Sequence, residues 1–390
     1  MAVPKLRFKA GDGSQFSRWE EKTIEEVAEC LDNKRVPVNS EERKKREGVI
    51  PYYGAGGIQG YIDDYLFDEE LVLLLEDGDA FDDFRTKSIA QYVTGKSWVN
   101  NHAHVLRANE NTYFLFASLE HKDIRRWTQL AGASRKKLLK DSLLKITVNM
   151  PSLPEQQKIA EFLSTIDTVI EKQKETVAVW EERKKGVMQK LFSQEVRFKD
   201  DDGSEFPEWE EKPFGDVVSE FKVKTKAEDE DTLLSCAING VFFNSELFDH
   251  QRGQSNIGYL KIKKGTLILS TQNLHLGNAN VNMRFKHGII SPAYKTYEIV
   301  GCSVEYMNQW VKWDLTKQFF YNATTVGASG CRRNVDWEML YSQPFAVPCL
   351  TEQQKIADCL SALDVVIEKQ KATLAAWEEL KKGLLQQMFV

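Results

Sequence analysis

The sequence predicts an α+β protein: two mixed α/β domains separated by two long antiparallel helices, a coiled coil, in a cyclic arrangement with pseudo-two-fold symmetry. A short motif occurs twice, a long segment with a helical pattern occurs twice, and the stretches between these repeats share little identity. We expect the first repeat motif and domain in residues 1–152, the first helix in 153–192, the second motif and domain in 193–349, and the second helix in 350–390.

The short motif opens each copy. It consists of Arg-Phe-Lys, then Asp-Gly-Ser, then Trp-Glu-Glu-Lys, and it starts at Arg7 and again at Arg197, about 190 residues later. The longer repeat aligns Leu153–Phe192 with Leu350–Phe389 without a gap, and roughly 26 of the 40 aligned positions are identical. Self-similarity of this extent indicates a duplicated unit.

The order of the repeats predicts a chain that closes on itself. A short link separates Phe192 from the second motif at Arg197, whereas the second long segment ends at Phe389 and the sequence stops at Val390. The continuation that this second segment lacks is the Arg7 motif at the other end. We therefore expect the two ends to meet in space, which gives both copies the same surroundings.

Each long segment carries a narrow apolar stripe with steps of 3, 4 and 7, which is one face of a helix. Such a stripe on so long a helix favours pairing with another helix, here the other copy. The alternative is that each helix packs on its own globular domain. Gln173 and Gln370 interrupt the stripe, either as register devices or as tolerated polar positions. The residues expected to pack are Ile159, Leu163, Ile166, Ile170 and Trp180, and Ile356, Leu360, Leu363, Ile367 and Trp377.

Residues 28–152 and 218–349 differ in sequence, yet each leads into the same helix. Both read as mixed α/β, with short strands and a turn expected in 61–65 and 71–79, with a turn into a strand in 261–270, and with a Gly-x-Ser turn at Gly132 and again at Gly327. A constant frame with divergent contents fits either an exchangeable recognition module or ordinary divergence after duplication.

Composition and motif searches exclude several function classes. The apolar content is 42%, no stretch reaches the ~20 apolar residues of a membrane span, and the start lacks the apolar core of a signal peptide. Six scattered cysteines suggest reduced thiols and a cytoplasmic location. No catalytic motif is found, and the glycine-rich 53–60 stretch predicts a tight turn rather than a cofactor loop. His102 and His104 lack spaced metal-ligand partners, so we expect no metal site and a loop or surface role for both.

Clusters of cations, amides and aromatic rings point instead to nucleic-acid contact. Asn and Gln amides can read adenine, and Arg or Lys can read guanine. The net charge of −6 argues against strong DNA binding by the chain alone, although the excess acid lies outside the two variable segments. Any one cluster can also be a solvated face. The candidate DNA contacts are Arg43, Lys44, Arg46, Tyr53, Lys96, Trp98, Asn100, Asn101, His102, Arg135, Lys136, Thr271, Gln272, Asn273, Arg332 and Arg333.

Together these features resemble the specificity subunit of a Type I restriction-modification system. The most specific likeness is the repeated Pro-x-x-x-Glu-Gln-Gln-Lys-Ile-Ala sequence at 151–160 and 348–357, where each long helix begins. The Gly-x-Ser turns and the 53–62 and 99–102 stretches also fit. The second turn departs from the family pattern, because Gly330-Cys331-Arg332-Arg333-Asn334 replaces the Lys/Leu-rich continuation.

The resemblance implies a division of labour. Each target-recognition domain reads one half-site of double-stranded DNA, and the helix pair fixes the spacer between the half-sites. Two methyltransferase subunits flip and methylate adenine, and restriction subunits add ATP-dependent translocation and cleavage. The chain itself is then expected to be non-catalytic and to need no cofactor, with S-adenosylmethionine, ATP and Mg²⁺ on the partner subunits. The competing hypothesis is a coiled-coil scaffold whose globular heads bind proteins.

Overall fold

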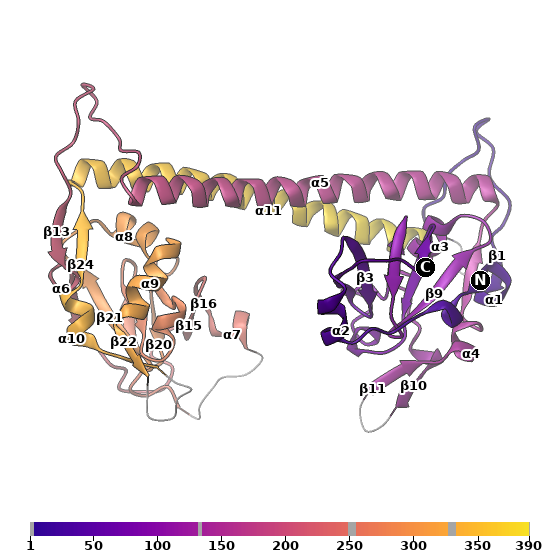
Figure 1. The fold of residues 1–390 in the computed structure, drawn as a ribbon, viewed down its shortest axis with the longest axis horizontal. Coiled ribbons are helices and arrows are strands. Elements are labelled where there is room, and N and C mark those ends of the chain that lie inside the picture. The colour runs from indigo at the N-terminus through magenta and orange to yellow at the C-terminus, as the bar shows by residue number, and fades with distance from the viewer. Residues whose placement is uncertain (1–3, 132–134, 249–254, 327–332, 390) are drawn as a thin grey trace. The chain divides into compact units, whose positions relative to one another are not determined.

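The computed structural model describes residues 4–131, 135–248, 255–326 and 333–389, which form two compact units. Unit 1 comprises Met1–Lys174 and Ala372–Val390, and unit 2 comprises Glu175–Lys371. The two long helices, α5 (Leu153–Phe192) and α11 (Leu350–Phe389), each contribute one end to each unit (Figure 1). The predicted fold class, mixed helix and sheet with two long helices, is confirmed.

Unit 1 is built on a four-stranded antiparallel sheet of order β2-β9-β6-β7, with α3 against β6 and β7. All five side chains of β6 are buried, as expected for a central strand of Leu and Val. Its elements before α5 are β1 (Glu20–Thr23), α1 (Ile24–Val27), β2 (Ala28–Cys30), η1 (Asp32–Lys34), α2 (Ser40–Lys45), β3 (Ile50–Gly54), β4 (Gly57–Ile62), β5 (Phe67–Asp68), β6 (Leu71–Leu75), η2 (Asp79–Phe81), β7 (Ala90–Val93), β8 (Lys96–Val99), β9 (Ala103–Ala108), α3 (Thr112–Leu119), η3 (Arg125–Trp127), β10 (Thr128–Ala131), β11 (Arg135–Leu138), α4 (Lys140–Leu143) and β12 (Thr147–Met150).

Unit 2 repeats this frame. Its sheet has the order β14-β21-β18-β19, again antiparallel, and α8 follows β21 as α3 follows β9. Its elements between α5 and α11 are β13 (Glu210–Pro213), α6 (Phe214–Val217), β14 (Val218–Phe221), β15 (Leu234–Ala237), β16 (Gly240–Phe243), α7 (Asn244–Leu247), β17 (Leu260–Lys263), β18 (Leu267–Ser270), η4 (Leu274–Leu276), β19 (Ala279–Val281), β20 (His287–Ile290), β21 (Tyr294–Ile299), α8 (Val304–Trp310), α9 (Asp314–Asn322), β22 (Thr324–Val326), β23 (Arg333–Val335), α10 (Trp337–Ser342) and β24 (Pro344–Val347).

Strands are present within the ranges 71–79 and 261–270, as β6 (Leu71–Leu75) and β18 (Leu267–Ser270), and the residues just before Gly265 form a further strand, β17 (Leu260–Lys263). The glycine-rich stretch forms the β3–β4 hairpin, in which Gly54 pairs with Gly57 across a two-residue turn, so the tight turn is confirmed. The strand expected at 61–65 starts earlier and ends at Ile62. The Gly-x-Ser turns at 132–134 and 327–329 lie outside the described residues.

Within each unit, parts of the two long helices pack against each other and against the domain. In unit 1, Ile159, Leu163 and Ile170 share one core with Leu385 and with the sheet and α3. In unit 2, Ile356 and Leu360 share a core with Leu191. Both expected packing modes are therefore present, because the apolar stripe of each helix contacts the other helix and the domain. Ile166 and Ile367 are also buried, whereas Trp180, Leu363 and Trp377 are half-buried.

An ion pair between the helices occurs in both units at equivalent positions. Lys381 lies 2.8 Å from Asp167 in unit 1, and Lys184 lies 2.6 Å from Asp364 in unit 2. In unit 2 a further pair, Lys371 with Glu181, shows that α11 numbering falls as α5 numbering rises. The helix segments in unit 2 are therefore antiparallel.

A buried clamp explains the short motif in unit 1. The Arg7 guanidinium donates to both carboxylate oxygens of Glu155, at 3.0 and 2.6 Å, and to the carbonyl oxygen of Ser17 at 2.7 Å. The Trp19 indole N–H donates to the same carboxylate at 3.1 Å. Glu155 is fully buried. A buried carboxylate is tolerated only when paired in this way, so Arg7, Trp19 and Glu155 are required together.

Unit 2 has the same clamp. Arg197 donates to both oxygens of Glu352, at 3.1 and 2.8 Å, and the Trp209 indole donates at 3.0 Å. In both helices the next motif residue, Gln156 or Gln353, donates from its amide to a proline carbonyl five residues earlier. The two repeated motifs therefore fold into one interaction, which joins the start of each domain to the start of the helix that follows it.

The predicted meeting of the chain ends is observed in unit 1. The backbone N–H of Leu6 donates to the carbonyl oxygen of Gln387 at 3.1 Å, and the rings of Trp19 and Phe389 are 6.2 Å apart. In unit 2 the chain itself runs through the equivalent junction. There the backbone N–H of Val196 donates a hydrogen bond to the carbonyl oxygen of Lys190. The non-covalent junction of unit 1 thus replaces a chain link.

Candidate nucleic-acid interface

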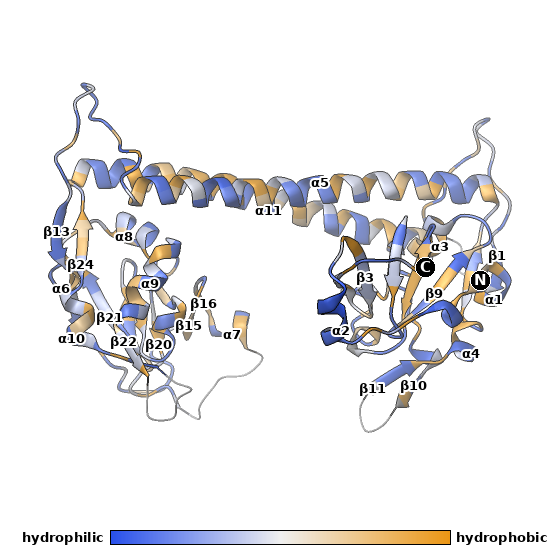
Figure 2. Ribbon diagram, in the orientation of Figure 1, coloured by the Kyte–Doolittle hydropathy of each residue, from blue (hydrophilic) through white to orange (hydrophobic). Residues whose placement is uncertain are grey.

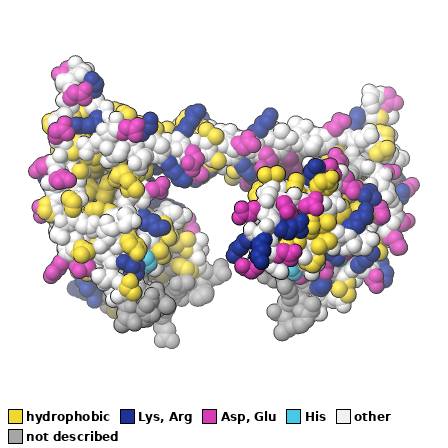
Figure 3. Space-filling model, viewed as in Figure 1, with side chains coloured by type: hydrophobic (Ala, Val, Ile, Leu, Met, Phe, Trp, Pro, Cys, Tyr) yellow, Lys and Arg dark blue, Asp and Glu magenta, His cyan; other side chains and the backbone are white. Residues whose placement is uncertain are grey.

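The strongest candidate surface in unit 1 lies over α2 and the β4-β3-β8-β5 sheet. The Arg43 guanidinium lies 4.6 Å from the ring centre of Tyr52, and that of Arg46 lies 4.7 Å from the ring centre of Trp98. Asp63 also accepts from Arg46 at 2.9 Å. Figure 2 shows α2 as strongly hydrophilic, and Figure 3 shows Lys and Arg side chains gathered over it. We call Arg43, Arg46 and Lys96, together with the rings of Tyr52 and Trp98, the α2 patch.

Stacking holds the arginines of the α2 patch in place. Tyr52 and Trp98 are 1% and 5% exposed, and their polar groups bond to the backbone at Val38 and Val36. The rings are therefore a fixed platform, and Trp98 acts as support for Arg46 rather than as an exposed DNA contact. A guanidinium on an aromatic face loses less freedom when it binds a phosphate or a guanine edge.

Four further cations of unit 1 were predicted to contact DNA. The Lys96 ammonium lies 4.5 Å from the Tyr65 ring centre, and Lys44 is exposed beside Glu41. Lys136 pairs with Asp82, and Arg135 lies in β11. These cations lie at the surface of unit 1, apart from Arg135, whose side chain is outside the described set.

The amide cluster forms a turn between β8 and β9. Asn100 is 4% exposed, donates to the Gln59 side chain at 3.2 Å and accepts from the His102 N–H at 2.8 Å. Its amide is therefore used to shape the turn, which leaves Asn101 exposed. Tyr53 is half-buried under this turn, and burial raises the pKa of its hydroxyl. We expect Asn101, rather than Asn100 or Tyr53, to be the residue available to DNA.

In unit 2 the candidate residues are divided. Gln272 and Asn273 are exposed at the end of β18, whereas the Thr271 hydroxyl donates to the Ala293 carbonyl. Arg333 donates to the hydroxyl and carbonyl oxygens of Thr324 and lies 4.1 Å from the Tyr321 ring centre, so it is engaged within the domain. Arg332 lies outside the described residues.

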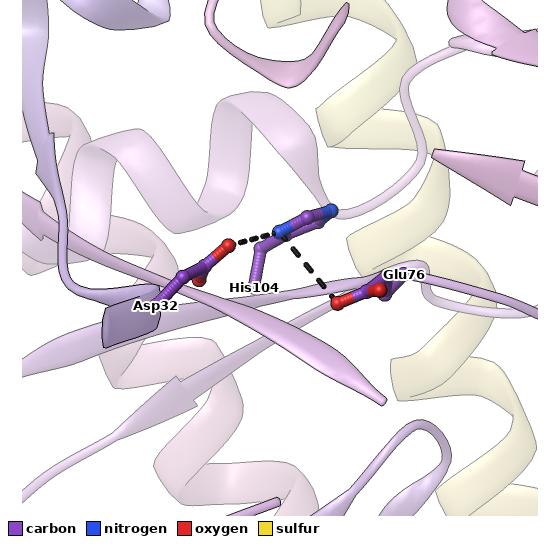
Figure 4. Close-up of side chains that lie close together, drawn as sticks. All are labelled: Asp32, Glu76 and His104. Carbon is purple, nitrogen blue, oxygen red and sulfur yellow. Dashed lines mark hydrogen bonds and ion pairs between the residues drawn. The ribbon is translucent and has the colours of Figure 1, made fainter. Parts of the chain in front are cut away.

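His104 is not at the surface, as the sequence suggested, but 1% exposed in β9. Its Nδ1 lies 2.6 Å from Asp32 and 3.9 Å from Glu76, and its Nε2 lies 2.9 Å from the Leu138 carbonyl oxygen (Figure 4). Both ring nitrogens are therefore engaged within the domain, one beside a carboxylate and the other beside a backbone carbonyl oxygen, which can only accept. Sequence spacing missed this because the partners are 72 and 28 positions away.

Asp32, Glu76 and His104 could together offer three ligand atoms to a metal ion. Arg35 forms an ion pair with both carboxylates, 3.3 Å from Asp32 and 2.5 Å from Glu76. Lys137 of β11 adds a further pair with Glu76 at 3.0 Å. Positive side chains thus balance the two carboxylates, so the cluster fits a structural role that ties η1, β6, β9 and β11 together.

This cluster predicts acid sensitivity of unit 1. Burial by itself raises the pKa of Asp32 and of Glu76, but the hydrogen bonds and charges of His104, Arg35 and Lys137 outweigh it and lower both pKa values. Folded values below the unfolded ones give stability that is complete above about pH 4 and is lost as the pH falls through the folded pKa. Denaturant unfolding between about pH 5 and pH 2 should therefore show falling stability.

His104→Gln should make this fall shallower, because the pKa of Asp32 is then less depressed. Glu42→Gln, which changes an exposed carboxylate on α2, is the control. Equal slopes for wild type and His104→Gln would contradict the assignment.

None of the described helices combines the length and apolar character that crossing a membrane requires. Residues 17–178 match the family described as the Type I restriction modification DNA specificity domain. A type I restriction enzyme specificity subunit of Haemophilus influenzae is 40% identical over 152 residues, which span 38% of each chain. The MjaVIII specificity subunit of Methanocaldococcus jannaschii is 24% identical, with 94% of this chain and 91% of that one aligned.

Among solved structures, the S subunit of the type I restriction-modification system from M. genitalium has the same fold. Its TM-score is 0.59 at 15% identity, covering 100% of this chain and 99% of that one. The domain match lies within the first copy of the repeat, and the long alignment spans both copies. Residues 17–178 therefore match a Type I restriction modification DNA specificity domain, and the chain is similar to a type I restriction enzyme specificity subunit over nearly its whole length.

Proposed function

We propose that the chain reads a bipartite DNA target, one half-site per unit, and positions methyltransferase and restriction subunits on it. The two units share a four-stranded antiparallel sheet of equivalent order and an Arg–Trp–Glu clamp, whereas their other sheets differ. Different heads on one frame suit an asymmetric target presented to equivalent partners.

The single observation that supports DNA reading most strongly is the α2 patch. Two arginines stacked on buried rings form a rigid cationic surface, and Asn101 lies exposed on the turn that follows β8. Arginine and asparagine are the side chains that read guanine and adenine edges, and arginine also neutralises phosphate. The chain's net charge of −6 leaves little general attraction for DNA.

Catalysis then belongs to partners. We propose that two methyltransferase subunits hold S-adenosylmethionine and that restriction subunits hold ATP and Mg²⁺, since the sequence carries no motif for these groups. The chain contributes target choice, and its affinity for DNA in isolation is expected to be weak.

Arg43→Ala and Arg46→Ala test the α2 patch. In the complex with its methyltransferase subunits, each change should raise the Kd for target DNA about tenfold. If the lost contact is to phosphate, the slope of log Kd against log salt should also fall by about 1. Fluorescence anisotropy with a labelled duplex measures both.

Lys174→Ala, an exposed cation on α5 paired with Glu171, serves as the matched control and should change neither quantity. Unaltered binding in both arginine variants, with the fold retained by circular dichroism, would exclude the α2 patch from the DNA interface.

A further inference from the structure

A cavity of about 780 Å³ lies in unit 1 between α3, the segment that follows it and the last turns of α11. Its lining combines apolar side chains, among them Ala117, Leu385 and Phe389, which we call the floor, with the cations Lys5, Lys122 and Lys382, which we call the walls. Figure 1 shows α3 beside the C-terminal end of the chain. We call this cavity the α11 groove.

The repeat provides a counterpart for this region in unit 2. Gln386 and Phe389 of the groove correspond in the helix alignment to Gln189 and Phe192 of α5. There the Trp313 indole N–H donates to Gln189 Oε1 at 3.0 Å, and the Trp313 ring lies 5.3 Å from that of Phe192. Unit 2 therefore covers this helix face with its own tryptophan, and no described residue of unit 1 makes the equivalent indole contact.

Helix caps show which residue takes the place of Trp313 in unit 1. Asn111 caps α3 and Ser303 caps α8, each accepting from the N–H three residues later. The tenth residue after the cap is His121 in unit 1 and Trp313 in unit 2. His121 is turned to the Phe84 carbonyl, at 2.6 Å, and lines the groove without filling it.

The paired phenylalanines also differ in exposure. Phe192 is 6% exposed, whereas Phe389 is only half-buried. A cavity of about 510 Å³ remains beside Phe192 in unit 2, but no charged side chain lines it among the described residues. The unit 1 site thus differs in being open along the end of its helix and in being cationic.

Charge indicates what the groove accepts. Its described lining contains four Lys and Arg side chains and one carboxylate, Asp123, which is paired with Arg125 at 2.6 Å. Burial, together with the charge of Arg126, lowers the pKa of Lys122, so a bound anion would relieve an existing penalty. Apolar floor and cationic walls together suit an acidic peptide segment better than a DNA backbone, which offers no apolar group for the floor.

We propose that the α11 groove binds an acidic segment of a partner subunit and that an aromatic side chain of this segment covers Phe389 and Gln386 as Trp313 covers Phe192 and Gln189. This inference rests on the proposed function only in that the chain has partner subunits. The partner's aromatic residue takes the place of the tryptophan that unit 1 lacks, and its carboxylates pair with Lys122 and Lys382.

The test uses the full chain and two synthetic peptides of eight residues, both acidic, one with a central tryptophan and one with alanine in its place. The tryptophan peptide should bind more tightly, and Lys122→Glu with Lys382→Glu should weaken it about tenfold or more. His121→Trp should fill the groove and abolish binding, while the unfolding midpoint is kept or raised.

Lys185→Glu is the matched control, because Lys185 is the counterpart of Lys382 in unit 2 and should not matter. Binding that ignores His121→Trp and the two lysine changes would overturn the proposal. So would competition by a non-target DNA duplex that the same lysine changes remove, since the groove would then be a DNA surface. Both outcomes leave target recognition untouched, because that is measured separately with the α2 patch variants.

Discussion

Glu155→Gln should destabilise unit 1 by about 3 kcal/mol or more, because it leaves the largely buried Arg7 without its counter-charge. The glutamine amide is uncharged and has a single acceptor oxygen, so it cannot replace a carboxylate that accepts two hydrogen bonds from the guanidinium and one from Trp19. Hydrogen exchange in denaturant should show early opening of residues 4–27 and of the start of α5.

The duplication supplies an internal control. Glu352→Gln removes the equivalent carboxylate in unit 2 and should open residues around Arg197 and Trp209 instead. Glu161→Gln, an exposed change two turns along α5, should alter stability by less than about 0.5 kcal/mol. If either clamp variant destabilised both units equally, the clamps would not be local to their units.

Leu163→Ala should cost about 2–5 kcal/mol. Leu163 is fully buried in the core shared by α5, α11, α3 and the sheet of unit 1, so truncation leaves a cavity that several elements line. Denaturant unfolding followed by tryptophan fluorescence measures the loss. Its size tests whether the helix belongs to the domain core as well as to the helix pair.

Leu360→Ala is the counterpart in unit 2 and should cost a similar amount, since Leu360 is also fully buried. Val365→Ala, on the same helix but 69% exposed, should be near neutral. A small effect of Leu163→Ala together with a large effect of Val365→Ala would contradict the assignment of the apolar stripe to the buried face of the long helices.

The repeat was sufficient to predict the fold class and the meeting of the ends, because identical motifs in a cyclic order need identical surroundings. It could not predict why the motifs recur. Arg7 and Glu155 are 148 positions apart, and no local pattern indicates that they form a buried pair. The available signal was the joint recurrence of three residues, the Arg and Trp of the short motif and the Glu of Glu-Gln-Gln-Lys. This recurrence could have indicated that they contact one another.

The structures of the two domains between the long helices were less predictable from the sequence. One four-stranded sheet in each domain has equivalent order and pairing but little shared sequence, since buried strands require only apolar side chains of suitable size. His104 was expected at the surface because its carboxylate partners come from distant elements, and Asn100 and Trp98 were expected to contact DNA although both are buried. Composition marks residues capable of contact, whereas burial decides which of them are available.

The most direct test of target reading exchanges residues 28–152 for the corresponding segment of a relative with a different specificity, and then determines adenine methylation across the host genome. We predict that one half of a bipartite methylated motif changes while the other half stays the same, since unit 2 is left intact. An unchanged motif, with the exchanged chain folded and assembled with its methyltransferase subunits, would contradict recognition by unit 1 and favour a protein-binding scaffold.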